Sequence, residues 1–223
     1  MAENAAVSRQ IAVYKTNKCL LETINCLKPA PGETPWHIHA EGKEEGYSLI
    51  RFNALDYSKG TGDHAVSVYA NLIPEDVKYL FMKLCMGYEE VLFEQQKIFN
   101  DPSRGGVVTI LRIDRAETNT DGEARRLPWT VDIRNGTGKV AYNKNGGQYC
   151  QAKSFREERH VRVLLDDAAF FRLLSRTCAV IDAFEQRHLY RDLEARNFRV
   201  LYRMLKEELD KRFGYPGSGY GAA

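Results

Sequence analysis

The residues best suited to chemistry in this chain are cations and aromatic rings that recur together between residues 112 and 159. Aromatic rings stack on the bases of single-stranded nucleic acid, and cationic side chains follow its phosphates. The segment Tyr142–Tyr149 has an aromatic residue at each end of a predicted tight turn and Lys144 near its tip. The predicted nucleic-acid-binding residues of this region are Arg112, Trp129, Arg134, Lys139, Tyr142, Lys144, Tyr149, Lys153, Phe155, Arg156 and Arg159. The alternative interpretation is a hairpin whose two tyrosines anchor an ordinary surface.

A smaller set of matching residues lies earlier in the chain. Its members are Arg51, Tyr57, Lys59 and Tyr69. The segment 57–62 superficially resembles a phosphate-binding loop. It lacks the Lys-Ser/Thr ending and the following helix that define such a loop, so we expect a hairpin tip there.

Metal and catalytic motifs are weak in this sequence. The segment Trp36–His39 places two imidazoles on one face of a strand, a spacing that can hold a metal. It has no accompanying ligand cluster, so we expect no metal and no cofactor. A nuclease needs carboxylates that converge on a metal, and Asp114, Asp132, Glu157 and Glu158 are the candidates for that alternative. Because no hydrolase or dinucleotide-binding motif occurs, we expect a protein that is not an enzyme.

The distribution of charge favours a nucleic-acid partner more than the net charge of +2 does. Residues 1–103 hold 10 Lys and Arg against 14 Asp and Glu, whereas residues 104–162 hold 12 against 7. A basic excess confined to one region is typical of a nucleic-acid-binding face. A solvated sheet face beside an acidic half would produce the same count.

Cysteine usage and hydropathy indicate a cytoplasmic protein with no membrane partner. The five cysteines are odd in number and form no Cys-x-x-Cys pair, which favours free thiols in a reducing compartment. No apolar run approaches the length of a membrane span, and the N-terminus does not read as a signal peptide.

A faint internal repeat predicts the elements that position these residues. Val66–Cys85 and Val161–Cys178 each read as an alternating strand, a helix-start signal and a helix with apolar residues at the 3.6 period. We expect helices over 74–86 and from Asp166 onward, with a bend or break near 182–188 and a second helix over about 188–212. Strands are predicted at 47–52, 64–72, 90–99, 106–115, 127–134, 138–142, 147–153 and 158–165, and residues 9–28 fit either a strand pair or a short helix.

Turn signals join these strands into antiparallel meanders. They lie at Asn119–Gly122, Asn135–Gly136 and Asn145–Gly147. Loops of two to four residues are too short for parallel crossovers, so neighbouring strands must run antiparallel.

The order of elements over residues 36–184 resembles the Whirly and PC4-like group of single-stranded DNA-binding proteins. The resemblance rests on Val66–Cys85, Val161–Cys178 and the hairpin turns between them. It implies that the strands form a surface for nucleic acid and that the helices pack the repeats together. The segments 48–63 and 143–147 also resemble small proteins of bacterial mobile elements, and that resemblance implies no activity.

We therefore expect an α+β fold, a duplicated antiparallel β-meander plus helix of Whirly-like type with an additional C-terminal helix. The expected divisions are an N-terminal segment (1–35), the duplicated core domain (36–184), a C-terminal helix (185–213) and a flexible tail (214–223). The expected function is non-enzymatic binding of single-stranded DNA with low sequence specificity. RNA binding and a protein-interaction or scaffold role, including a homo-oligomer formed through the C-terminal helix, are the alternatives, and a hydrolase ranks third.

Overall fold

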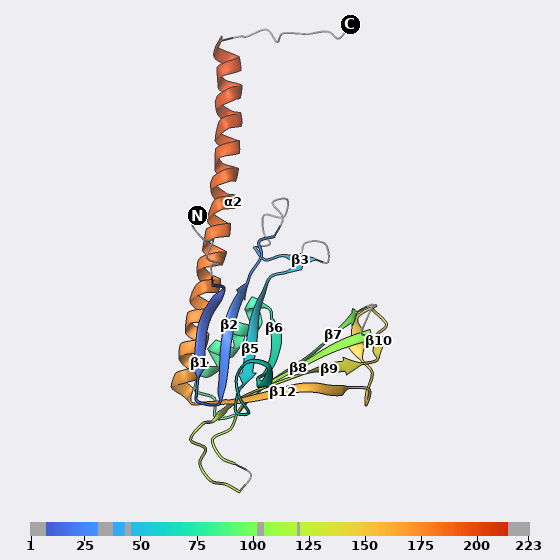
Figure 1. Ribbon diagram of the computed structural model, residues 1–223. Helices are drawn as coiled ribbons and strands as arrows, with labels where there is room; N and C mark the ends of the chain where they lie inside the picture. The colour runs from blue at the N-terminus through green and yellow to red at the C-terminus, as the bar shows by residue number, and fades with distance from the viewer. Residues whose placement is uncertain (1–7, 31–37, 43–45, 102–104, 120, 214–223) are drawn as a thin grey trace, which may run out of the picture.

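The computed structural model describes residues 8–30, 38–42, 46–101, 105–119 and 121–213. Two four-stranded antiparallel sheets dominate these residues, and a helix follows each sheet (Figure 1). The predicted α+β class and the antiparallel pairing are confirmed. The proposed tail lies outside the described residues.

The first sheet has the strand order β1-β2-β5-β6. Its strands are β1 (Gln10–Lys15), β2 (Cys19–Cys26), β5 (Leu49–Asp56) and β6 (Val66–Leu72). Two short strands, β3 (Glu41–Gly42) and β4 (Gly46–Tyr47), and a 3₁₀ turn at Gly62–His64 lie in its connections. The ambiguous segment 9–28 is thus a strand pair, in which Leu21 and Thr23 are buried and Glu22 faces the other side. The sheet begins at β1, so the core starts well before the expected boundary at residue 36.

The second sheet has the strand order β12-β9-β8-β7. Its strands are β7 (Val91–Asp101), β8 (Gly105–Arg115), β9 (Trp129–Gly138) and β12 (Arg156–Leu165). A separate hairpin, β10 (Val140–Tyr142) and β11 (Gln148–Cys150), connects β9 to β12. The turn predicted at Asn135–Gly136 is wrong, because Asn135 pairs with Thr109 on one side and with Arg159 on the other, inside β9. Glycine is required at position 136 since the carbonyl of Arg156 occupies the space of a Cβ.

Both helices begin where the sequence predicts. Pro74 occupies the first turn of α1 (Pro74–Cys85), and Gly87, at φ +68°, follows its end. The amide of Ala169 donates to Asp166 Oδ1 at 2.6 Å, so Asp166 is the N-cap of α2 (Asp167–Phe213).

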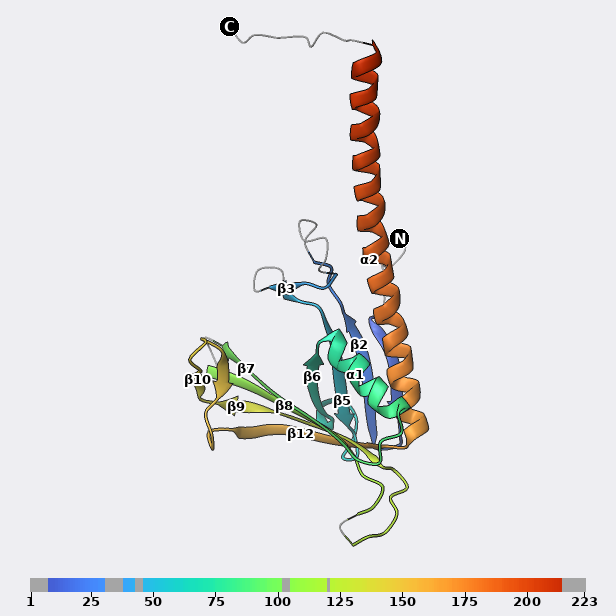
Figure 2. The ribbon, with the colours of Figure 1, turned by 180° about the vertical axis from the view of Figure 1, so that it is seen from behind.

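The predicted break in α2 is wrong, because one continuous helix of 47 residues runs through residues 182–188. Figures 1 and 2 show its second half extending beyond both sheets. The expected separate C-terminal helix is therefore the continuation of α2. Lys78 of α1 forms ion pairs with Asp182 at 2.7 Å and with Glu185 at 2.6 Å, which fixes the helix where the break was expected. No helix in the described ranges combines the length and apolar composition that a membrane span requires.

One continuous apolar core joins both sheets to α1 and the first half of α2. Phe52 of the first sheet, Trp129 of the second, Leu80 of α1 and Phe170 of α2 are all fully buried in it. Thr23 Oγ1 and Thr177 Oγ1 lie 2.8 Å apart inside this core, and Thr177 also donates to the carbonyl of Leu173. The polar pair is satisfied, so it fixes β2 against α2 without an unpaired group.

The reactivities of Cys85 and Cys178 provide an experimental test of this buried core. Burial raises the pKa of Cys178 to about 11, whereas Cys85 is exposed on α1. Since the thiolate is the reactive form, iodoacetamide should modify Cys85 of the native protein rapidly and Cys178 only after unfolding. Peptide mass spectrometry after timed labelling measures both rates. Equal native rates at the two cysteines would show that Cys178 is not packed between the helices.

Arg115 connects the start of α2 to the second sheet. Its guanidinium is only 12% exposed and donates to both carboxylate oxygens of Asp167, at 3.1 and 3.3 Å. It also donates to the carbonyls of Tyr88 and Glu89, and the Trp129 indole donates to Asp167 Oδ1 at 2.7 Å. These bonds place the first turn of α2 on the end of β8.

This junction predicts a pH dependence of stability. The hydrogen bond from Arg115 lowers the pKa of Asp167 below its usual value, and the bond from Trp129 adds to this, although burial acts in the opposite direction. A carboxylate with a lowered folded-state pKa stabilises the fold above its unfolded pKa, about 3.9, and that contribution is lost as the pH falls through the folded pKa. Urea unfolding from pH 7 to below pH 4 should show a steeper acid loss for the wild type than for Asp167→Asn. Parallel curves for the two proteins would contradict the ion pair.

Candidate nucleic-acid interface

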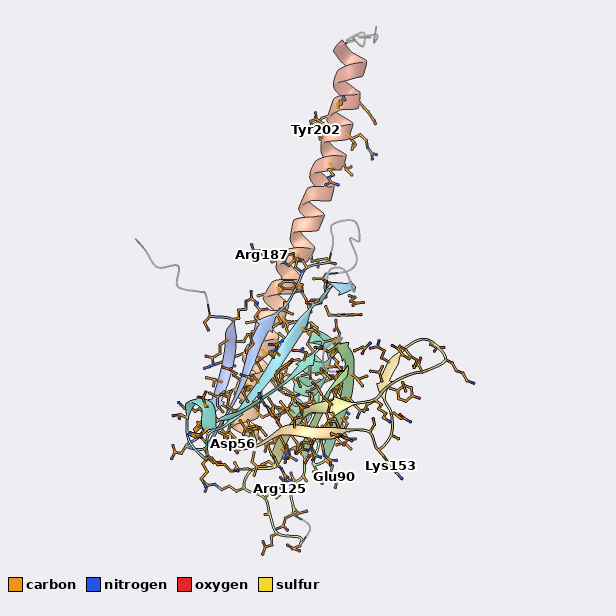
Figure 3. All side chains as sticks on the ribbon, turned by 45° about the vertical axis from the view of Figure 1, so that its right-hand side comes forward. Asp56, Glu90, Arg125, Lys153, Arg187 and Tyr202 are labelled. Atoms are coloured by element: carbon orange, nitrogen blue, oxygen red, sulfur yellow. The ribbon has the colours of Figure 1, made fainter. Side chains whose placement is uncertain are left out.

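A basic hollow lies at the end of the second sheet that points away from the helices. We call it the distal hollow; it has a volume of about 590 Å³. Its polar lining consists of Thr137, Lys139, Gln151, Lys153, Ser154 and Arg156. None of the described residues that line it is acidic. Figure 3 shows Lys153 at this end of the sheet, far from the labelled residues of α2.

Glycines and a short hydrogen-bonded loop shape the distal hollow. A Cβ at Gly138 would lie 2.5 Å from Cys150 Sγ, and a Cβ at Gly106 would collide with the carbonyl of Gly138. The strands and the β10–β11 hairpin can therefore approach only because these positions have no side chain. The amide of Lys139 donates to Ser154 Oγ at 3.0 Å, and the amide of Gln151 donates to the carbonyl of Lys139 at 2.8 Å. These bonds hold the loop 151–154 against the end of β9.

Lys153 has a backbone conformation that is unfavourable for a side-chain-bearing residue. Its φ of +62° is left-handed, and it is the one non-glycine residue with positive φ among those described. Such a conformation costs about 1–2 kcal/mol for an L-residue with a side chain. Glycine would relieve that strain, whereas Lys153 brings an ammonium group to the lining of the distal hollow.

The β10–β11 hairpin places two exposed tyrosines next to the distal hollow. Tyr142 is 59% exposed and Tyr149 is 48% exposed. Tyr142 pairs with Gln148 and Tyr149 pairs with Ala141, so the two rings project from opposite faces of the hairpin. The predicted tight turn is confirmed, because Asn143 and Gly147 exchange backbone and side-chain hydrogen bonds around Lys144. Cys150 anchors the hairpin in a small apolar cluster on the second sheet. Aromatic faces are thus available to bases beside a group of cations.

The structure places Phe155 and Trp129 in apolar packing. Phe155 is partly buried and packs against the small apolar cluster that contains Cys150. Trp129 is fully buried in the main core, where its ring lies 4.5 Å from that of Phe170. Both rings hold the fold together, and Trp129 is not accessible to a base.

Arg112 and Arg134 lie on the outer face of the second sheet, where carboxylates pair with them. Arg112 bonds to Glu94 at 2.9 Å and to Asp114 at 3.0 Å. Arg134 bonds to Asp132 at 2.9 Å and lies 3.8 Å from Glu157. The structure therefore separates these two predicted cations from Lys139, Lys153 and Arg156, because acids on the same strand and on neighbouring strands pair with the former.

Three of the carboxylates considered for a nuclease, Asp114, Asp132 and Glu157, belong to the same outer-face network. Asp132 Oδ2 lies 2.9 Å from His160 Nε2. Burial would raise the pKa of Asp132, but hydrogen bonds from Arg134 and His160 lower it below its usual value. In the described part of the chain, no three His, Cys, Asp or Glu side chains are placed to hold a metal. His37 lies outside that part, and His39 bonds to Ser48 and Glu185.

The candidates of the first sheet are not gathered at one place. The Tyr57 hydroxyl donates to the carbonyls of Thr16 and Cys19, which braces the β1–β2 turn, and Lys59 is exposed in the adjacent turn. Arg51 lies near the other end of β5, on the order of 20 Å away along the strand. Its guanidinium stacks on the ring of Tyr69 at 4.4 Å.

Sequence reasoning missed the residues that make the distal hollow a cavity: the glycines at 105, 106 and 138 and the polar residues Thr137, Gln151 and Ser154. The sequence did contain a signal for this basic region, because residues 136–156 contain four Lys and Arg and no Asp or Glu. Comparison with known protein families, with curated proteins and with solved structures finds no match to this chain.

Proposed function

We propose that the chain binds single-stranded nucleic acid, without catalysis, at the distal hollow and the β10–β11 hairpin. The observation that carries this proposal is the grouping of Lys139, Lys153 and Arg156 in one hollow without an acidic lining residue among those described. Phosphates would occupy the hollow, and bases would stack on Tyr142 and Tyr149. Stacking and phosphate contacts tolerate any base, so specificity would be low.

The arrangement of the sheets supports the same proposal. Two antiparallel four-stranded sheets, each followed by a helix, fit the Whirly-like order of elements. On this interpretation the ligand is single-stranded DNA, with RNA as the close variant. Five free thiols favour the reducing cytoplasm as the site of action.

The test is fluorescence anisotropy with labelled oligo-dT of about 16 nucleotides, the matching RNA and a double-stranded DNA. The purified full chain should bind oligo-dT at micromolar or lower concentration in low salt and bind the duplex more weakly. Binding should fade as salt is added, since phosphate contacts release counterions. Stronger binding to RNA would change the ligand but keep the site, and no binding to any of the three would reject the proposal.

The exposed half of α2 favours a second function, a docking helix for a protein partner. Val200, Tyr202, Met204 and Leu205 are 46%, 62%, 61% and 55% exposed on the part of the helix beyond the sheets (Figure 3). A lone projecting helix gains little stability of its own, so apolar residues there favour a partner chain. Sedimentation of the full chain distinguishes self-association from a monomer that needs another partner.

A further inference from the structure

A second basic hollow lies on the first sheet and is independent of the residues discussed above, apart from Arg51. We call it the proximal hollow; its volume is about 530 Å³, and its lining includes Arg9, Asn25, Lys28, Tyr47, Leu49 and Arg51. Tyr47 is 49% exposed, and no described lining residue is acidic. The composition, three cations with an exposed aromatic ring, matches that of the distal hollow and its hairpin.

Contacts along one path connect the two hollows. Arg51, which lines the proximal hollow, stacks on Tyr69 of β6 at 4.4 Å. The side-chain amide of Asn135 in β9 accepts from the Tyr69 amide and donates to the Tyr69 carbonyl, both at 3.0 Å. Thr137 lies on the same face of β9 as Asn135, about 7 Å further along, and lines the distal hollow. The edge of the first sheet is thus fixed against the face that leads to the distal hollow.

The path between the hollows is itself basic and aromatic. Tyr69 is 44% exposed, so its ring is accessible beside the Arg51 guanidinium. Arg159 of β12 is exposed and pairs directly with Asn135, which places it on the same face of the second sheet. The partners seen for Arg51 are the side-chain oxygen of Asn71 and the Tyr69 ring, which are both uncharged.

We infer that a single strand bound in the distal hollow continues over Asn135 and Tyr69 into the proximal hollow, so that one strand occupies both sheets of one chain. This inference rests on the proposed function, because it extends the same ligand to a second site. Polyanionic nucleic acid is the occupant that fits, since a repeating phosphate can meet cations at both ends and along the path, while bases stack on Tyr47 and Tyr69.

Oligonucleotide length provides the test. A strand of about 4 nucleotides fills one hollow at most, whereas a strand of about 16 nucleotides can reach both, these being the limits of common site sizes. In a Tyr47→Ala/Arg51→Gln variant, the affinity for the longer oligo-dT should fall at least about tenfold and that for the shorter one should change little. Lys59→Gln, an exposed charge loss elsewhere on the same sheet, serves as the control and should change neither. Circular dichroism melting confirms that each variant is folded.

Each result of the oligonucleotide experiment supports or overturns the path between the two hollows. A loss confined to the longer strand supports the two-hollow path. An unchanged affinity for the longer strand overturns the path and leaves the distal hollow as the binding site. An equal loss at both lengths also overturns it, because the short strand would then be bound in the proximal hollow. Absence of wild-type binding at every length overturns the proposed function and the path together.

Discussion

Replacing Trp129 with alanine lowers the free energy of unfolding by an expected 3–5 kcal/mol, roughly the range for large aromatic residues in a core. Trp129 is fully buried, its ring lies 4.5 Å from that of Phe170, and its indole N–H donates to Asp167. Alanine would leave a large cavity where β9 meets the start of α2. It would also remove the hydrogen bond that the indole donates to the Asp167 carboxylate. Urea unfolding followed by circular dichroism measures the change.

Two further variants separate this structural role from the predicted stacking role. Trp129→Phe keeps most of the apolar volume and loses the indole donor, so it should cost clearly less than alanine and leave oligo-dT affinity unchanged. Tyr149→Ala, at an exposed hairpin position, should change stability by no more than about 0.5 kcal/mol and should weaken binding. If Trp129→Phe weakened binding in a folded protein, Trp129 would have to contact the ligand.

Removing the three cations of the distal hollow should lower oligo-dT affinity about 100-fold in low salt. The variant is Lys139→Ala/Lys153→Gly/Arg156→Ala, in which each removed charge loses one phosphate contact. Glycine is chosen at 153 because the φ of +62° suits it, so this change relieves backbone strain rather than adding to it. Anisotropy titration of the variant and the wild type under identical conditions gives the ratio of dissociation constants.

The matched control removes three cations from other places, in Lys59→Gln/Arg112→Gln/Arg134→Gln. Its net charge equals that of the distal variant, but Arg112 and Arg134 are ion-paired on the outer face and Lys59 lies in a turn of the first sheet. Its affinity should stay within about threefold of the wild type, reflecting only the weak long-range attraction. Equal losses in the two variants would mean that net charge, and not the hollow, determines binding.

Local signals in the sequence predicted most of the elements. Asp166 caps α2 and Pro74 opens α1 as expected, because both signals act within one helical turn. The turn around Lys144 formed as predicted for the same reason. The pair Asn135–Gly136 gave a false turn signal, since the need for glycine at 136 comes from the Arg156 backbone on a neighbouring strand.

Long-range pairing accounts for the part of the site that sequence could not predict. Arg112 and Arg134 each pair with an acid two residues away, Asp114 and Asp132, and also with Glu94 and Glu157 of neighbouring strands, whose register the sequence did not show. Trp129 has an apolar ring with one polar atom, and only the folded packing against Phe170, with Asp167 accepting from the indole, shows that it belongs in the core. The expected break in α2 is wrong, and Lys78, about a hundred residues earlier, pairs with Asp182 and Glu185 in that stretch of the continuous helix.

The most direct test of the distal hollow is the salt dependence of oligo-dT affinity in the wild type and the Lys139→Ala/Lys153→Gly/Arg156→Ala variant. A plot of the logarithm of affinity against the logarithm of salt concentration has a slope of about −0.7 for each phosphate of a single strand that a protein cation neutralises. The slope for the variant should be shallower than that of the wild type by about 2, which corresponds to three lost contacts. A wild-type affinity independent of salt, or equal slopes in the two proteins, would contradict phosphate binding in the distal hollow.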